Sequence, residues 1–230
     1  MPDWGRDGGG APSVSAVATR ALLAFGLPLV VLAVVLAVLV PSLLVAGVIV
    51  LYLALVWWWV SSQGRRVLRL AGAEPPRGGG SARILNLVAG LSADLAIPAP
   101  EVLVADDERA NALVCLAGGP KFVVTSSLLE GFTRTEQEAV VAHCLVRLRG
   151  GQVRWTQLSL ALGPFGGALV AQVGGADDVA AASLTRYPPA LAAAVRKAEA
   201  ATGRYGALWF VGGGTSHVPA EQRAAALADL

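Results

Sequence analysis

The sequence predicts an α+β fold that is mostly helical with a small sheet, preceded by a hairpin of two transmembrane helices. Three observations lead to this expectation. Residues 21–60 carry no charged side chain. Three short runs rich in β-branched and apolar residues come later, at 101–105, 113–116 and 122–125. Helical patterns lie on both sides of these runs, at 82–95 and 133–149, and elements segregated in this way are typical of α+β domains.

Composition places the chain among membrane proteins. Of its 230 residues, 55% are hydrophobic and 15% are charged, with a mean hydropathy of +0.60. The formal net charge of +2 comes with no basic stripe interleaved with aromatics, so nucleic acid is excluded as a partner. Cys115 and Cys144 are the two cysteines, too few for a disulfide framework, and reduced thiols are expected. The lipid bilayer is the expected partner.

The uncharged run is too long for one span. At about 1.5 Å per residue it would measure about 60 Å, roughly twice the hydrocarbon core. Pro41-Ser42 interrupts it near the middle, so residues 17–62 are expected to hold two spans, at about 17–40 and 43–60. Residues 1–16 contain Gly, Pro and Asp without periodicity and are expected to form a disordered tail.

Flanking residues predict the orientation of the hairpin. Trp57, Trp58 and Trp59 close the second span and are typical of an interfacial aromatic belt. Arginines flank both spans, at Arg6, Arg20, Arg65, Arg66 and Arg69, and the turn has none. The positive-inside rule then puts both ends in the cytoplasm. We therefore expect a multi-pass protein of the cell membrane whose soluble domain, residues 63–230, faces the cytoplasm.

A second uncharged stretch covers residues 155–173, where Gly163-Pro164 and Gly166-Gly167 interrupt it. It is short for a span, so a buried or membrane-dipping helical pair is favoured over a true crossing. The Ala-rich region 176–201 is expected to form two helices divided by Pro188-Pro189.

The helix over 133–149 carries the most informative motif. Thr133 and Glu136 have capping-box spacing, and Gly150-Gly151 ends the helix. Within it the sequence reads His143-Cys144-Leu145-Val146-Arg147. A zinc peptidase helix has the form H-E-x-x-H, in which two His one turn apart bind the metal and the Glu is the general base. Here Cys144 stands at the Glu position and Arg147 at the second His position.

Residues 130–143 resemble the active-site helix of the membrane-bound HtpX-like zinc peptidases, a group that includes the CAAX prenyl proteases. Asn111-Ala112 followed by Gly118 resembles the family's Asn-Ala strand, although the Gly comes later here. His217, with Arg223 after it, resembles the family's C-terminal His-Pro…Arg region. The resemblance implies a zincin-like metallopeptidase domain, metalloendopeptidase activity, a zinc cofactor and a role in membrane-protein quality control.

The resemblance also implies a third zinc ligand, a Glu in an E-x-x-A-D pattern. Asp178 takes the Asp place of that pattern, and Gly174 then falls on the Glu. His143 is thus expected to be the one surviving ligand, and the general base is expected to be lost at Cys144. Catalytic zinc needs about three protein ligands, so no cofactor is expected. Arg147 is always charged and repels a cation.

These observations favour a catalytically inactive pseudopeptidase that acts by binding. It would hold a membrane-protein client, or an active peptidase relative, through the old substrate cleft. Cys144 is expected to be a small core residue, and Arg147 to fill the site, paired with Asp177 or Asp178. Two alternatives stay open: an active zinc-dependent membrane endopeptidase with a non-standard site, and a structural membrane protein with no cleft function.

Overall fold

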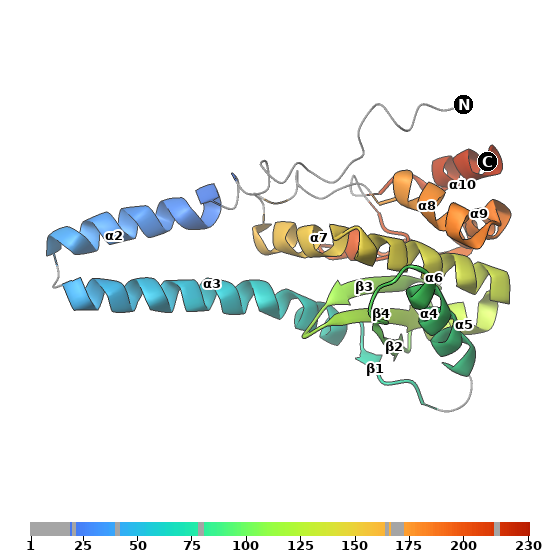
Figure 1. Cartoon of the computed structure of the whole chain (residues 1–230), viewed down its shortest axis with the longest axis horizontal. Helices are drawn as coiled ribbons and strands as arrows, with labels where there is room; N and C mark the ends of the chain where they lie inside the picture. Colours follow the sequence, from blue (N-terminus) through green and yellow to red (C-terminus); the bar gives the residue numbers. More distant parts are fainter. Residues whose placement is uncertain are drawn as a thin grey trace.

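The computed structural model describes residues 19, 22–39, 42–77, 81–163, 166, 173–213 and 217–230. Two apolar helices project from a domain of helices around a small sheet (Figure 1). The mostly helical α+β class is confirmed. The expected disordered tail, residues 1–16, lies outside the described residues, as does the break at 40–41.

The projecting helices differ in length. A π-helical turn, η1 (Leu22–Gly26), leads into α2 (Leu27–Leu39), and α3 (Ser42–Leu70) lies alongside them (Figure 1). The hydroxyl of Tyr52 donates a 2.8 Å hydrogen bond to the Phe25 carbonyl, which joins α3 to η1. Within the described residues, α3 alone is long and apolar enough to cross a membrane.

Within the described residues the structure therefore shows one long apolar helix and not the predicted hairpin of two full spans. With 13 residues, α2 is about 20 Å long, short of the roughly 30 Å hydrocarbon core. The continuous run of apolar letters gave no sign of where the regular helix would begin.

The long helix α3 continues past its apolar part into the domain. Gln63 and Val67, seven and three residues from its end at Leu70, are buried. Gly64 is required there, because a Cβ would lie 1.9 Å from the Leu116 carbonyl oxygen. Trp59 donates a 3.0 Å hydrogen bond to the Ala161 carbonyl, and Arg66 lies 4.1 Å from its ring centroid. Trp59 was expected in an interfacial aromatic belt, and instead it joins α3 to the domain.

The sheet is mixed and has four strands, in the order β1-β2-β4-β3. Its strands are β1 (Ala73–Glu74), β2 (Glu101–Ala105), β3 (Ala112–Leu116) and β4 (Pro120–Thr125). β2 and β4 are parallel, and the other two pairs are antiparallel. β3 is thus an edge strand. β1 was not predicted, since two residues carry no alternating pattern.

The described residues of the domain form eight further helical elements. They are α4 (Ala82–Asp94), α5 (Ser126–Gly131), α6 (Arg134–Arg149), α7 (Gln152–Ala161), α8 (Ala176–Thr185), α9 (Pro188–Lys197), η5 (Gly206–Leu208) and α10 (Ala220–Ala228). α6 and α7 lie between the sheet and the group α8–α10 (Figure 1). The uncharged stretch 155–173 begins in α7, and residues 164–165 and 167–172 lie outside the described residues.

α6 runs through the middle of the domain and contacts α4, α7, α8, α9 and β3. Its capping box is present: Thr133 N–H donates to the Glu136 carboxylate at 2.7 Å, and Glu136 N–H donates to Thr133 Oγ1 at 3.3 Å. Residues 139–145 are all fully buried. A helix surrounded on all sides places its polar side chains inside the protein, where each needs a partner.

Candidate functional site

His143 lies at the centre of the candidate site. It is fully buried in α6, and its ring meets Phe210 edge-on at 5.1 Å. Nδ1 is 2.9 Å from Oδ1 of Asp178, out of line for a straight hydrogen bond, and Nε2 has no hydrogen-bond partner among the described residues. Burial lowers the pKa of His143 and outweighs the effect of the Asp178 carboxylate, which raises it. The imidazole is therefore neutral at physiological pH.

Asp178 is held by an arginine from another helix. It stands in the first turn of α8, and Arg223 of α10 donates to both of its oxygens, from Nε and Nη2, at 2.8 Å each. Burial alone would raise the pKa of Asp178, but the charge and hydrogen bonds of Arg223 hold it well below its usual range. Both partners are nearly inaccessible to solvent. The pair is a buried, bidentate ion pair.

Arg147 lies one turn beyond His143, buried to the same degree. Its Nη2 donates to the Ala207 carbonyl at 2.7 Å, and Nη1 reaches the Trp209 and Leu208 carbonyls at 3.4 and 3.5 Å. The predicted pair with Asp177 or Asp178 is wrong: Arg223 holds Asp178, and Asp177 accepts a 2.7 Å hydrogen bond from Gln152. One helical turn moves Arg147 about 6 Å along α6, away from the level of Asp178.

A short segment, Ala207–Val211, covers this part of α6. It lies beside edge strand β3, where Phe210 N–H donates to the Ala112 carbonyl at 2.7 Å. Buried side chains bind its carbonyls in turn. Besides the Arg147 bonds, His217 Nε2 lies 3.1 Å from the Trp209 oxygen, Arg223 donates to Phe210 at 2.8 Å, and Asn111 donates to Val211 at 2.7 Å. No motif in the sequence indicates that this segment belongs to the site.

The Ala207–Val211 segment therefore brings most of the predicted site residues together. Asn111, Ala112, Arg147, His217 and Arg223 all contact its backbone. Gly118 does not join them. It takes a φ of +72° in the β3–β4 turn, and a Cβ there would point into open space.

Gly174 lies against the side chain of Arg223. Gly174 has a φ of +111°, and a Cβ on it would lie 2.9 Å from Cδ of Arg223. A longer side chain at this position has no room while Arg223 binds Asp178.

Cys144 is fully buried, and burial raises the pKa of its thiol to about 12. It is therefore protonated at neutral pH and cannot act as a general base there.

These residues do not fit a catalytic zinc ion. Nε2 of His143 could bind one, with Asp178 orienting the ring, as carboxylates do for ligating histidines. However, the described residues contain no group of three His, Cys, Asp or Glu side chains placed to hold a metal. Both oxygens of Asp178 already bind Arg223, and the guanidinium of Arg147 adds a second positive charge nearby. A cation here would have one protein ligand, where catalytic zinc takes three.

Comparison with known proteins shows a distant, partial similarity to peptidases. The chain is 35% identical over 91 residues to "Protease HtpX homolog" of Dictyoglomus thermophilum, and 34% identical over 91 residues to the protein so named from Dictyoglomus turgidum. Each alignment covers 38% of this chain and 30% of the relative, so the chain matches less than a third of their length. No protein-family model matches the chain.

Proposed function

We propose that this protein is a membrane-anchored, catalytically inactive relative of HtpX-type metallopeptidases, which acts by binding in membrane-protein quality control. The similarity to HtpX protease homologues and the long apolar helix α3 support the family relation and the anchor. The Arg223–Asp178 pair carries the argument for lost activity. It takes up the carboxylate nearest His143 and fills the space beside Gly174 with an arginine.

The proposal reads α6 as a degenerate H-E-x-x-H helix. Cys144 replaces the general base, and its pKa of about 12 leaves it unable to accept a proton from water at neutral pH. Arg147 replaces the second ligand and hydrogen bonds carbonyls instead of an ion. Gly174 replaces the third. Either of the two ligand losses, at Arg147 or at Gly174, is sufficient to remove the three-ligand centre that metal-assisted hydrolysis requires, and the loss at Cys144 removes the general base.

The surface that binds a protein partner is proposed to lie away from α6. A client is not expected in the old cleft, because the Ala207–Val211 segment occupies that position. The segment lies against His143 and Arg147, and its Phe210 N–H donates to the carbonyl of Ala112 at the start of β3. Partners would instead meet other faces of the domain. Arg65, Arg66 and Arg69 at the end of α3 favour a cytoplasmic position for those faces.

One observation favours the alternative, an active zinc endopeptidase. A histidine with Nδ1 beside a carboxylate and a free Nε2 has the arrangement of a metal ligand, and His143 shows it. The remaining ligands would then have to come from residues outside the described ranges, or from a partner.

A cleavage assay separates the two functions. Purified full-length protein is incubated with casein, with and without a zinc chelator, beside His143→Ala. We expect no chelator-sensitive cleavage from wild type or from the double variant Cys144→Glu/Arg147→His, because position 174 still lacks a ligand. Chelator-sensitive cleavage that His143→Ala abolishes would overturn the proposal.

A further inference from the structure

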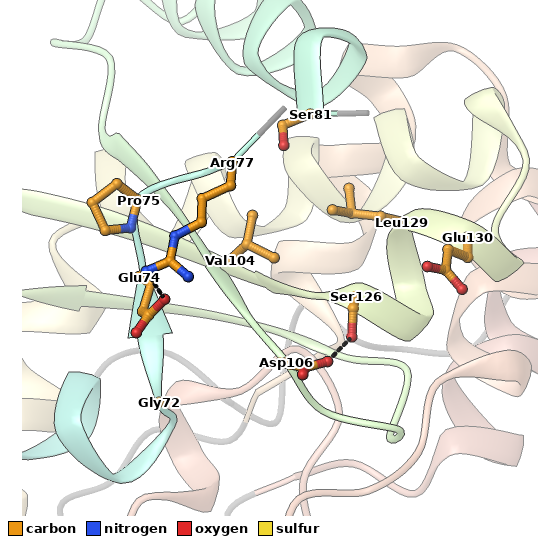
Figure 2. A pocket seen from close by; sticks show the side chains of 10 residues that line it. All are labelled: Gly72, Glu74, Pro75, Arg77, Ser81, Val104, Asp106, Ser126, Leu129 and Glu130. Carbon is orange, nitrogen blue, oxygen red and sulfur yellow. Dashed lines mark hydrogen bonds and ion pairs between the residues drawn. The ribbon is translucent and has the colours of Figure 1, made fainter. Parts of the chain in front are cut away.

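A cavity opens at the carboxyl ends of the two parallel strands, away from His143 (Figure 2). Its volume is about 700 Å³, within the usual range for ligand pockets. Glu74, Pro75, Arg77 and Ser81 line one side, and Ser126, Leu129 and Glu130 of α5 line the other. Crevices beyond the carboxyl ends of parallel strands are common binding positions in proteins that contain both helices and sheets.

The cavity has an excess of negative charge. Glu74 is paired with Arg77 at 2.8 Å, so these two charges cancel. The carboxylate of Asp106 accepts one hydrogen bond, from Ser126 at 3.1 Å, and the carboxylate of Glu130 has no hydrogen bond or ion pair with the described residues. Two carboxylates thus remain without a cation. The side chains of Val104 and Leu129 lie on one side of these carboxylates and provide an apolar wall (Figure 2).

Ser81 adds a buried polar group to the same cavity. It is 5% exposed, and its hydroxyl points into the space between Val104 and Leu129 (Figure 2). Although Ser81 is the N-cap of α4, its hydroxyl makes no capping bond, and it has no partner among the described residues. Because this hydroxyl makes no bond to the described residues, it can donate to or accept from a polar group of a ligand in the cavity.

The cavity also lies close to the membrane anchor along the chain. Gly72 and Glu74 line it, and they follow directly after α3, which ends at Leu70. From Arg65 to that end, α3 rises by only about 8 Å. A peptide strand that leaves the bilayer beside α3 can therefore reach the cavity within a few residues, at about 3.3 Å each.

We propose that this cavity binds a lysine or arginine side chain from the juxtamembrane segment of another membrane protein. The aliphatic stem would lie on Val104 and Leu129, and the charged head would bind Asp106 and Glu130, with Ser81 accepting a hydrogen bond. This inference rests on the proposed function, because a cytoplasmic binding domain next to the bilayer meets the segments in which Lys and Arg are concentrated. Long cationic side chains commonly bury their stems while the head stays hydrated.

A labelled peptide tests the proposal. Full-length protein in zwitterionic detergent is titrated at low salt with a fluorescent peptide that alternates Arg and Leu, and anisotropy is measured. A peptide with citrulline in place of each Arg is the neutral match. We expect the Arg peptide to bind and the citrulline peptide to bind at least several-fold more weakly. Asp106→Asn/Glu130→Gln should weaken the Arg peptide by roughly five- to tenfold, and added salt should do the same.

Matched variants keep the test specific. Glu221→Gln removes an exposed carboxylate on α10 and should leave binding unchanged, whereas Ser81→Ala should weaken it. Equal binding of both peptides, or an unchanged double variant, would overturn the proposal, as would spermidine binding as tightly as the peptide. Cleavage of the peptide by a zinc-loaded sample would instead overturn the proposed lack of activity and leave the cavity assignment intact.

Discussion

Arg223 and Asp178 join α10 to α8 through two parallel hydrogen bonds of 2.8 Å, directly beside the buried ring of His143. The same guanidinium donates to the Phe210 carbonyl and lies 5.0 Å from the Phe210 ring centroid. One arginine therefore connects three separate parts of the chain around α6. A metal ion in a structural site makes connections of this kind, and here a fixed charge makes them.

Breaking this pair should cost more than any other single change in the site. Arg223→Ala leaves the Asp178 carboxylate buried and unpaired, a loss of about 3–5 kcal/mol. For a domain of this size the midpoint of thermal unfolding should fall by roughly 10 °C. A melt in detergent measures it, and Arg149→Ala, an exposed arginine on α6, serves as the control that should change little. Equal midpoints for the two variants would mean that the pair contributes nothing.

Arg147→Ala should be destabilising by a smaller amount. Arg147 binds carbonyl oxygens and has no carboxylate partner, so its removal leaves acceptors unpaired, at about 1–3 kcal/mol. Arg147→Met, which fills most of the space without the charge, should restore part of the loss. The same melts compare the variants. A larger effect at Arg147 than at Arg223 would contradict the assignment of the ion pair.

Gly174→Ala should reveal the contact with Arg223. The new Cβ would lie 2.9 Å from that side chain at a φ of +111°, so both collision and backbone strain apply. Gly118→Ala, with a φ of +72° and open space, isolates the strain, which is of order 1–3 kcal/mol. We expect the midpoint to fall further for Gly174→Ala. If Gly118→Ala were the worse of the two, position 174 would have room for a longer side chain.

Acid should destabilise the protein in part through His217. Burial lowers its pKa to about 3; the bond to Trp209 opposes this shift, and the charges of Arg147 and Arg223 add to it. The unfolded chain, with an ordinary pKa near 6.5, binds the proton first, so stability falls as pH drops from about 6.5 toward 3. At pH 5 the loss through this group is about 2 kcal/mol relative to pH 7.5. Melts at the two pH values should show a smaller acid effect for His217→Asn; an identical effect would remove His217 from the account.

Orientation can be tested with reporters. A fluorescent protein fused at Leu230 should fold and fluoresce, and alkaline phosphatase fused there should stay inactive. Both follow because the arginines at the end of α3 keep this end of the helix, and the domain after it, in the cytoplasm. A second pair of reporters at Gly10 decides whether the chain crosses once or twice. An active phosphatase at Leu230 would place the domain outside the cell membrane.

The sequence was informative where local rules apply. The capping box at Thr133 and Glu136 formed as predicted, because its bonds lie within one turn of helix. The second span was predicted at about 43–60, and α3 continues beyond it through Ser61, Ser62 and Gln63, which are half-buried or buried against the domain. Hydropathy reports the preferred solvent of a residue and not the contacts that replace water.

Pairings between distant elements were beyond sequence reasoning. Helical spacing put Arg147 on the same face as His143, but it could not tell which of Arg147 and Arg223 would reach Asp178. That choice depended on how α10 packs against α8 and α9. Arg223 on α10 lies 45 residues after Asp178 in the chain, so no local pattern links the two. The Ala207–Val211 segment was missed for the same reason, since its binding partners are Asn111, Arg147, His217 and Arg223.

Zinc content tests the central claim, that the site around His143 has lost its metal chemistry. Full-length protein, purified in detergent without chelator and dialysed against buffer containing zinc and then against buffer without it, is analysed by mass spectrometry for metal per chain. The account predicts a content far below one zinc ion per chain, the same as for His143→Ala. One zinc ion per wild-type chain, lost in His143→Ala, would contradict it.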